Sequence, residues 1–200
     1  MRNLSLFCLI VLIATLSACG GTGKVYSLRD RGEGLGWVFY VDPDNAKLLP
    51  EGKKYLEVTS FDQSPAVGIA WGEGAATGSI ATAVGTGQAN TDKIIATKGA
   101  GTYAARLCRD LVSGGFSDWF LPSKDELNKI YINLQKGVDE NGVAYPPAGV
   151  GTFTNDYYWS STEINSELAL EQVIDSSDVD HAPFDNFKQA TASVRCVRAF

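Results

Sequence analysis

The chain has 200 residues, 44% of them hydrophobic, and a formal net charge of −6, which fits one acidic domain of ordinary size. Residues 1–18 hold one basic and no acidic residue, so the remainder carries 16 − 23 = −7 charges. An acidic surface repels the phosphates of nucleic acids and disfavours general binding of sulfated glycans. Nucleic acid is therefore excluded as a predicted partner.

Residues 1–18 have the pattern of a bacterial lipoprotein signal peptide. Arg2 precedes an apolar run at residues 4–16. At about 1.5 Å per residue, this run is too short to cross a hydrocarbon core of roughly 30 Å, so it is typical of a signal peptide. The Leu-Ser-Ala-Cys sequence that ends at Cys19 resembles a lipobox, in which the cysteine is lipidated. The alternative is an ordinary secretory signal that is followed by a cysteine.

On the lipoprotein interpretation, Cys19 carries acyl chains and residues 19–31 form a flexible tether. Two or more acyl chains hold a protein stably on a membrane. We therefore expect an exported protein that is anchored by lipid in the bacterial cell envelope, either periplasmic or surface-exposed. Residues 32–200 are predicted to form its single domain.

Two cysteines remain after the signal peptide and the lipidated residue are removed, namely Cys108 and Cys196. An even pair in an exported chain indicates a disulfide, with two buried free thiols as the alternative. The cysteine and histidine spacing does not match a zinc site. No metal site and no cofactor are predicted.

The hydrophobic patterns predict strands that alternate with loops and two helices. Strands are predicted at residues 37–41, 55–59, 157–161, 168–174 and 193–200, with a further short apolar segment at 69–71. Helices are predicted at residues 102–112 and 124–135, and loops at 72–87 and 136–152. Within the first loop, Gly85-Thr86-Gly87 lacks the remaining residues of a phosphate-binding motif, so we interpret it as a plain loop. So long a loop often marks a binding surface.

The second helix begins at a recognisable corner of the chain. An apolar run at residues 119–121 ends at Pro122, which has no N–H to continue a strand. Ser123 and Glu126 have the spacing of a capping box, in which each side chain accepts a backbone N–H at the start of a helix. The apolar residues that follow repeat at helical spacing. A strand, a turn and a buried helix face are therefore predicted here.

Several segments in the same order resemble the DUF1566 family, also named for the C-terminal domain of the Legionella collagen-like adhesin. The most specific are the Trp-x-Leu-Pro-Ser-x-x-Glu-Leu corner and the Tyr-Trp-Ser-Ser-Thr-Glu strand. Their motif residues are Asp118, Trp119, Leu121, Pro122, Ser123, Glu126, Leu127, Trp159, Ser160 and Ser161. The resemblance implies a loop-rich, single-domain α+β fold with a mixed or antiparallel sheet and two helices. It also implies kinship with C-type-lectin-like and sulfatase-modifying-factor folds, and a surface or secreted location. Family members occur as lipoproteins and as adhesin modules.

Two carboxylates are candidates for catalysis, Glu126 and Glu163. Glu126 has a structural role as the capping partner of Ser123, and Glu163 lies at a strand end where an acid is ordinary. His181, the single histidine, lies in a polar loop and is expected to be exposed to solvent. A nucleophilic triad therefore lacks its base.

The remaining candidates are aspartates and aromatic residues. Asp175, Asp178, Asp180 and Asp185 do not follow the order of a calcium loop, so a solvated acidic loop is expected. Trp119 and Trp159 are predicted to lie in the core. Trp71 borders the glycine-rich loop. Trp71 and Glu163 are the predicted ligand-binding residues.

These observations favour a non-catalytic, adhesin-like module that is anchored by lipid and binds a glycan or a protein. The first alternative is an envelope enzyme that uses Glu126 or Glu163 as an acid. The second is a structural envelope lipoprotein without a ligand of its own.

Overall fold

The computed structural model describes residues 24–43, 46–145, 150–154, 156–175 and 181–200. The predicted signal peptide, Cys19, Asp178 and Asp180 lie outside these residues. Within them the chain forms eight strands and three helices, and none of those helices is long and apolar enough to cross a membrane. The strands are β1 (Trp37–Val41), β2 (Tyr55–Val58), β3 (Ile69–Ala70), β4 (Asp156–Glu163), β5 (Leu168–Ile174), β6 (Phe184–Phe187), β7 (Thr191–Ala192) and β8 (Val197–Ala199). The helices are α1 (Gly87–Lys98), α2 (Ala104–Arg109) and α3 (Lys124–Leu134).

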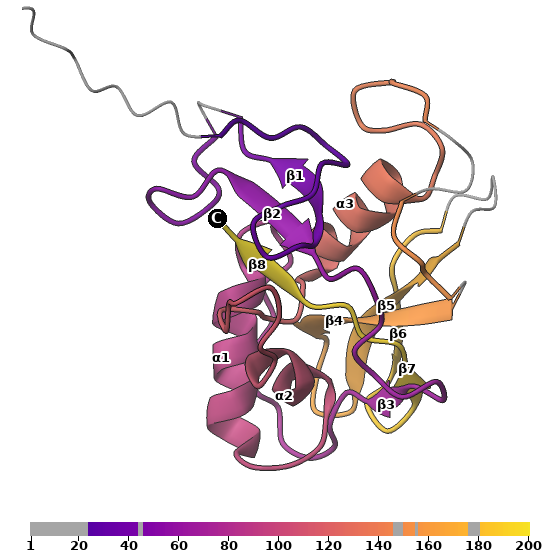
Figure 1. The fold of residues 1–200 in the computed structure, drawn as a ribbon. Helices are drawn as coiled ribbons and strands as arrows, with labels where there is room; N and C mark the ends of the chain where they lie inside the picture. The colour runs from indigo at the N-terminus through magenta and orange to yellow at the C-terminus, as the bar shows by residue number, and fades with distance from the viewer. Residues whose placement is uncertain (1–23, 44–45, 146–149, 155, 176–180) are drawn as a thin grey trace, which may run out of the picture.

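The strands form three antiparallel sheets, with the orders β1-β2-β8, β3-β7 and β4-β5-β6 (Figure 1). The chain is therefore an α+β protein, in agreement with the sequence. The prediction of one sheet with two helices is wrong, since the described residues hold three of each. The predicted strand at residues 193–200 is shortened to β8, and β6 is not anticipated because only part of it is apolar and its side chains are largely exposed.

Helix α3 lies between the first sheet and the β4-β5-β6 sheet, where it contacts β1 on one side and β4 and β5 on the other (Figure 1). Helices α1 and α2 contact one another, and α1 also packs against β4. Two large apolar clusters result. The first joins α3 to the first sheet, and the second joins α1 and α2 to β4 and the short β3-β7 sheet.

Helix α1 is missed by the sequence patterns because its buried face is largely polar. Its buried residues Gly87, Asn90, Thr91 and Ile94 have helical spacing, but only Ile94 is a large apolar residue. The polar members make specific bonds instead. The Asn90 amide donates to the carbonyl oxygen of Ala81 at 2.6 Å, and the Thr91 hydroxyl oxygen accepts the backbone N–H at position 121 at 3.0 Å.

The predicted corner before α3 is confirmed in its hydrogen bonds. The Ser123 hydroxyl oxygen accepts the N–H of Glu126 at 3.3 Å, and the Glu126 carboxylate accepts the N–H of Ser123 at 2.7 Å. Phe120 exchanges backbone bonds of 2.8 and 2.9 Å with Val197 at the start of β8. The corner is thereby attached to the first sheet.

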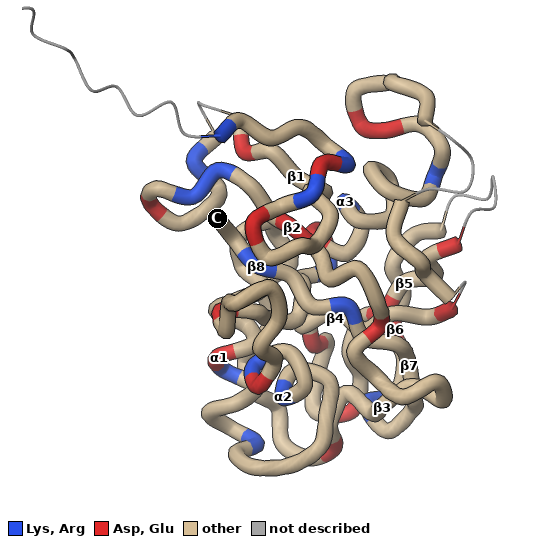
Figure 2. The backbone as a smooth tube through the Cα atoms, viewed as in Figure 1, with Lys and Arg blue, Asp and Glu red and all other residues tan. Residues whose placement is uncertain are grey.

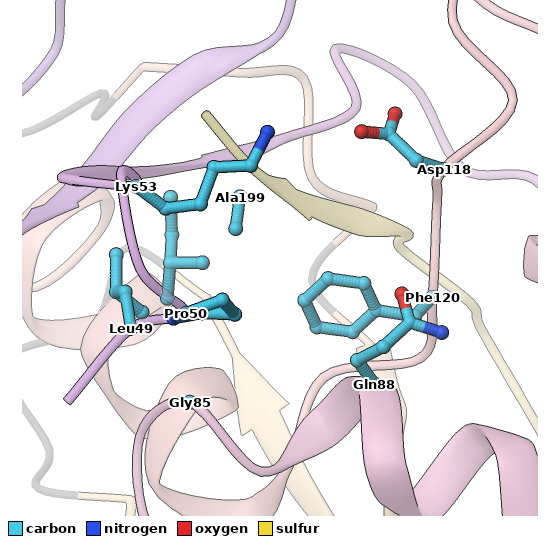
Figure 3. Close-up of a pocket in the computed structure, with 9 residues that line it drawn as sticks. Leu49, Pro50, Lys53, Gly85, Gln88, Asp118, Phe120 and Ala199 are labelled. Atoms are coloured by element: carbon cyan, nitrogen blue, oxygen red, sulfur yellow. The ribbon is translucent and has the colours of Figure 1, made fainter.

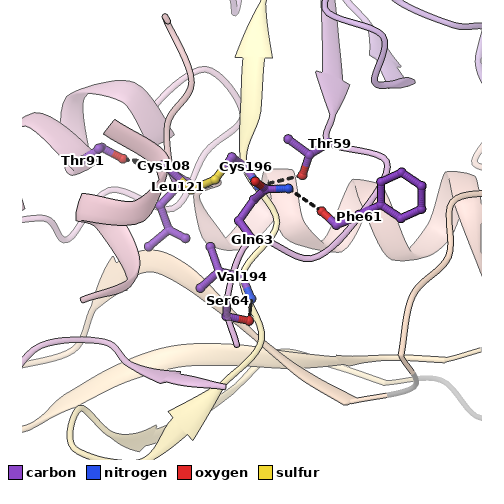
Figure 4. The surroundings of a disulfide bond; sticks show 9 residues. All are labelled: Thr59, Phe61, Gln63, Ser64, Thr91, Cys108, Leu121, Val194 and Cys196. Carbon is purple, nitrogen blue, oxygen red and sulfur yellow. Dashed lines mark hydrogen bonds between the residues drawn. A yellow bond between two sulfur atoms is a disulfide. The ribbon is translucent and has the colours of Figure 1, made fainter. Parts of the chain in front are cut away.

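The predicted disulfide is confirmed, and it joins α2 to the residue before β8 (Figure 4). The sulfur atoms of Cys108 and Cys196 are 2.05 Å apart, the Cα atoms are 5.3 Å apart, and both residues are fully buried. The backbone N–H of Cys196 also donates to the Thr59 hydroxyl at 3.3 Å. The bridge lies within the second apolar cluster, and the hydrogen bond from Cys196 to Thr59 links that cluster to the chain that leaves β2.

Candidate functional site

A glycine-rich loop, residues 72–86, runs from the end of β3 to the start of α1, and two buried glutamates hold its backbone. Glu163, the last residue of β4, accepts N–H groups from Thr77 and Gly78. Glu126, in the first turn of α3, accepts N–H groups from the far end of the loop. Glu126 and Glu163, the two candidates for catalysis, thus hold the same loop, and each accepts hydrogen bonds from different backbone N–H groups.

Glu126 is fully buried, and its carboxylate accepts the N–H groups of Ser123 at 2.7 Å, Gly85 at 2.8 Å and Gly87 at 3.4 Å. Gly85 has a φ of +87°, and a Cβ there would lie 2.0 Å from the carbonyl oxygen of Leu48. A Cβ on Gly87 would lie 2.2 Å from Oε2 of Glu126. The backbone of the Gly-Thr-Gly segment therefore binds the carboxylate of the protein's own Glu126. A side chain on Gly85 or Gly87 would collide with Leu48 or with Glu126, so both positions require glycine.

Burial raises the pKa of Glu126 from 4.5 to about 7, while the backbone N–H groups of Ser123, Gly85 and Gly87 act in the opposite direction. The carboxyl group therefore changes its protonation state near neutral pH. Its side chain lies behind Gly85, which is part of the wall of the pocket described below.

The raised pKa of Glu126 predicts a pH-dependent stability. The folded state binds a proton more tightly than the unfolded chain, so this group stabilises the fold below about pH 4.5 and loses that contribution as the pH rises to about 7. A difference of about 2.5 pKa units corresponds to about 3 kcal/mol of unfolding free energy. Urea denaturation at a series of pH values between 4.5 and 8 measures the slope.

Glu126→Gln is the matched variant for this slope, because its amide does not titrate. The difference in unfolding free energy between the wild type and the variant should change by about 3 kcal/mol across the same pH range. Glu171, whose pKa burial also raises, stays in both proteins and cancels in the difference. A constant difference from pH 4.5 to 8 would contradict the prediction.

Glu163 forms a buried ion pair with Lys188, the residue after β6. The Lys188 ammonium lies 2.7 Å from the carboxylate, and both side chains are at most 2% exposed. The same carboxylate accepts the N–H of Thr77 at 2.8 Å and that of Gly78 at 2.5 Å. Burial opposes ionisation of Glu163, but the Lys188 ammonium and these donors together hold its pKa below its ordinary value. Glu163 is thus an ionised structural anchor, and the sequence contains no pattern that identifies Lys188 as its partner.

The aromatic prediction for Trp71 is wrong, because the ring is fully buried and has no face open to a ligand. Its indole N–H donates to the carbonyl oxygen of Ser160 at 2.7 Å, and the Lys188 ammonium lies 4.4 Å from the ring centre. An apolar residue next to a glycine-rich loop looks exposed in sequence, but here the ring is part of the second apolar cluster, and the Lys98 ammonium also lies 5.6 Å from its centre. Trp119 and Trp159 lie in the core, as predicted.

His181 is half-buried and not fully exposed as predicted, because it packs near Tyr131 and its Nε2 lies 3.1 Å from both carboxylate oxygens of Asp175. Of the predicted acidic loop, only Asp175 and Asp185 are among the described residues. Within that part of the chain no three Asp, Glu, His or Cys side chains are grouped closely enough to hold a metal ion.

A small apolar pocket of about 120 Å³ opens beside the glycine-rich loop (Figure 3). Its wall combines segments that are far apart in sequence. It is lined by Leu49, Pro50, Lys53, Leu56, Gly85, Gln88, Asp118, Phe120 and Ala199. Asp118 belongs to the predicted corner motif, whereas no sequence pattern identifies the 49–53 segment that forms the opposite wall.

Asp118 at this pocket is tied to a buried charge network. The Arg198 guanidinium donates to Asp118 at 2.8 and 3.2 Å and to the fully buried Glu57 at 2.8 Å. Glu57 also accepts the N–H groups of Gly34 and Gly36, at 2.7 and 2.8 Å. The network joins one cation to two carboxylates and holds residues 34–36 against the first sheet.

No protein-family model and no curated protein match the chain. The residues and their contacts are therefore the basis for assigning a role. The described site offers a small apolar pocket, a loop that is fixed from inside, and carboxylates that are bonded within the protein.

Proposed function

We propose that the protein is a lipid-anchored domain of the bacterial cell envelope that binds a glycan or a protein and catalyses no reaction. The proposal includes cleavage after residue 18, lipidation of Cys19, and a short tether to a single domain. It is supported by the signal-like segment, the lipobox-like sequence and the one internal disulfide.

One observation carries the non-catalytic part of this proposal. Both carboxylates that an acid-catalysed reaction would use are buried and occupied, Glu126 by three backbone N–H groups and Glu163 by Lys188 and two backbone N–H groups. A general acid must lie within hydrogen-bond reach of its substrate. Carboxylates that hold a loop from its inner side do not meet that requirement.

The proposal extends to the finer fold assignment. We infer that the domain belongs to the DUF1566 family and is related to C-type-lectin-like and sulfatase-modifying-factor folds. The α+β architecture with short antiparallel sheets is compatible with it. The two most specific motifs also meet in space, because the N–H of Ser161 in β4 donates to the carbonyl oxygen of Pro122 at 2.7 Å.

Screening the purified mature protein in mild detergent against arrays of glycans and of extracellular matrix proteins tests the binding role. We expect saturable binding to one class that heat-unfolded protein does not show. Silence across both arrays, together with turnover of an envelope substrate by the same preparation, would refute the proposal.

The predicted anchor has its own test in Cys19→Ala. Without the lipidated thiol the protein should move from the membrane pellet to the soluble fraction, since the acyl chains supply the attachment. Immunoblotting of fractionated cells measures the distribution, with Cys8→Ala as a control that keeps both the lipobox-like sequence and the disulfide. If the Cys19→Ala protein still sediments with membranes, the anchor is assigned to the wrong residue.

The envelope-enzyme alternative draws on one observation, namely the pKa of about 7 for Glu126, a value suited to a general acid. If it holds, Glu126→Gln abolishes turnover of an envelope substrate while the protein remains folded. Glu163→Gln is the parallel test for the second carboxylate. Equal turnover by both variants and the wild type would remove this alternative.

A further inference from the structure

The pocket beside Gly85 has the size and lining of a site for one small apolar group. Its floor and walls are formed by Leu49, Pro50, Leu56, Phe120 and Ala199, and its volume is about 120 Å³. An apolar cavity of about 150 Å³ in another protein accepts benzene. One aromatic ring or branched aliphatic side chain therefore fills this space.

The charges at the mouth of the pocket are not equivalent. The ammonium of Lys53 and the carboxylate of Asp118 lie on the same side of the opening (Figure 3). Both carboxylate oxygens of Asp118 already accept hydrogen bonds from Arg198. Within the described part of the chain the Lys53 ammonium has no hydrogen-bond or ion-pair partner. The Lys53 ammonium is therefore the group at the opening that can pair with an anionic ligand, whereas the Arg198 guanidinium is shared between Asp118 and Glu57.

The surroundings reinforce this positive charge. The turn that leads into β2, residues 46–54, carries three lysines, Lys47, Lys53 and Lys54, and one acid, Glu51 (Figure 2). The Asp42 carboxylate is held at the same turn by the N–H groups of Leu48 and Leu49, at 2.9 and 3.2 Å, so the lysines outnumber the acids there. On a protein whose net charge is negative, this local excess attracts an anion.

The lining also discriminates between ligand classes. A sugar ring presents hydroxyl groups on most of its edges, and each buried hydroxyl needs a hydrogen-bond partner. The polar side chains at the pocket, those of Lys53, Gln88 and Asp118, lie among otherwise apolar walls. An apolar body with one charged end suits this arrangement better than a monosaccharide does.

We propose that this pocket binds an apolar group of about benzene size that carries a carboxylate, with the ring or branched chain inside and the carboxylate paired with Lys53. Such a group occurs in free aryl or branched-chain acids and at the C-terminus of a peptide that ends in an apolar residue. The inference rests on the proposed binding role and names the ligand chemistry of one site.

The test compares four probes on the mature protein in mild detergent, by calorimetry and by saturation-transfer NMR. They are 3-phenylpropionate, its uncharged amide, N-acetyl-phenylalanine as a mimic of a peptide terminus, and N-acetylglucosamine. We expect 3-phenylpropionate to bind about fivefold more tightly than its amide, a difference typical of one exposed ion pair. Tighter binding of N-acetyl-phenylalanine would identify a peptide terminus as the source, and tighter binding of 3-phenylpropionate a free acid.

Two variants locate the site. Lys53→Gln should remove the preference for the acid over its amide, and Ala199→Leu should abolish binding of both by filling the pocket. Lys47→Gln makes the same charge change on the same turn, outside the pocket lining, and should leave the preference intact. Thermal unfolding of each variant verifies that it is folded.

Equal affinity for the acid and the amide, binding that survives Ala199→Leu, or preferential binding of N-acetylglucosamine at this pocket would overturn the inference. The glycan and matrix arrays separate this failure from that of the proposed function. A positive array with no carboxylate binding removes the pocket assignment alone, whereas a negative array with enzymatic turnover removes the binding role.

Discussion

Replacing Lys188 by methionine should lower the free energy of unfolding by about 3–5 kcal/mol, the cost of leaving one partner of a buried ion pair uncompensated. The Glu163 side chain is 1% exposed and would be left in the interior without its ammonium partner. Equilibrium denaturation in urea measures the loss. An increase in the pKa of Glu163, followed by NMR titration, should accompany it.

Lys129→Met is the matched control, because it breaks a lysine–glutamate pair in which both partners are more than a quarter exposed. Surface pairs contribute at most about 1 kcal/mol. A loss from Lys188→Met that is no larger than the loss from the control would show that the buried pair does not anchor the glycine-rich loop.

A double substitution separates the charge from the packing. Glu163→Gln keeps an oxygen that can accept the N–H groups of Thr77 and Gly78, and it removes the buried negative charge. The Lys188→Met and Glu163→Gln double variant should therefore be more stable than Lys188→Met alone. Losses that simply add would mean that the two side chains are not coupled.

Breaking the bridge between Cys108 and Cys196 should cost about 4–5 kcal/mol on the chain-entropy model, because the bond closes a long loop. The two cysteines are 88 residues apart in sequence. Urea denaturation with and without a reductant measures this difference. The cysteine pair is fully buried, so reduction should proceed through unfolding.

The Cys108→Ala and Cys196→Ala double variant is the control for the reductant. It should have reduced stability under both conditions and show no further loss when reductant is added. Peptide mapping without reduction should yield one fragment pair joined through Cys108 and Cys196. Equal stability of oxidised and reduced wild-type protein would contradict the expected contribution.

The parts of the fold that the sequence predicts are those with a local physical signal. Helix α3 is predicted because Ser123 and Glu126 form a capping box ahead of an apolar face. Strand β5 is predicted to the residue from its apolar run. The disulfide is predicted because two cysteines, Cys108 and Cys196, lie outside the predicted signal peptide and its lipobox-like sequence.

The parts that the sequence does not predict depend on contacts between distant segments. Helix α1 buries Asn90 and Thr91, whose partners come from the loop before it and from the corner at residue 121. Trp71 is buried by contacts with Ser160 of β4 and with Lys188, which lie far from it in sequence. The pocket is missed for the same reason, because its lining comes from four separate stretches of chain.

The pairing of β2 with β8 constrains when the protein can become complete. Leu56 of β2 lies opposite Ala199 of β8. The β1-β2 pair is synthesised early, and β8 is synthesised some 140 residues later, so β2 lacks its second neighbour until the end of synthesis. Until then one edge of that pair offers unpaired backbone groups, which are a template for aggregation. A nascent chain therefore needs protection of this edge, and a chaperone that shields extended segments should increase its yield.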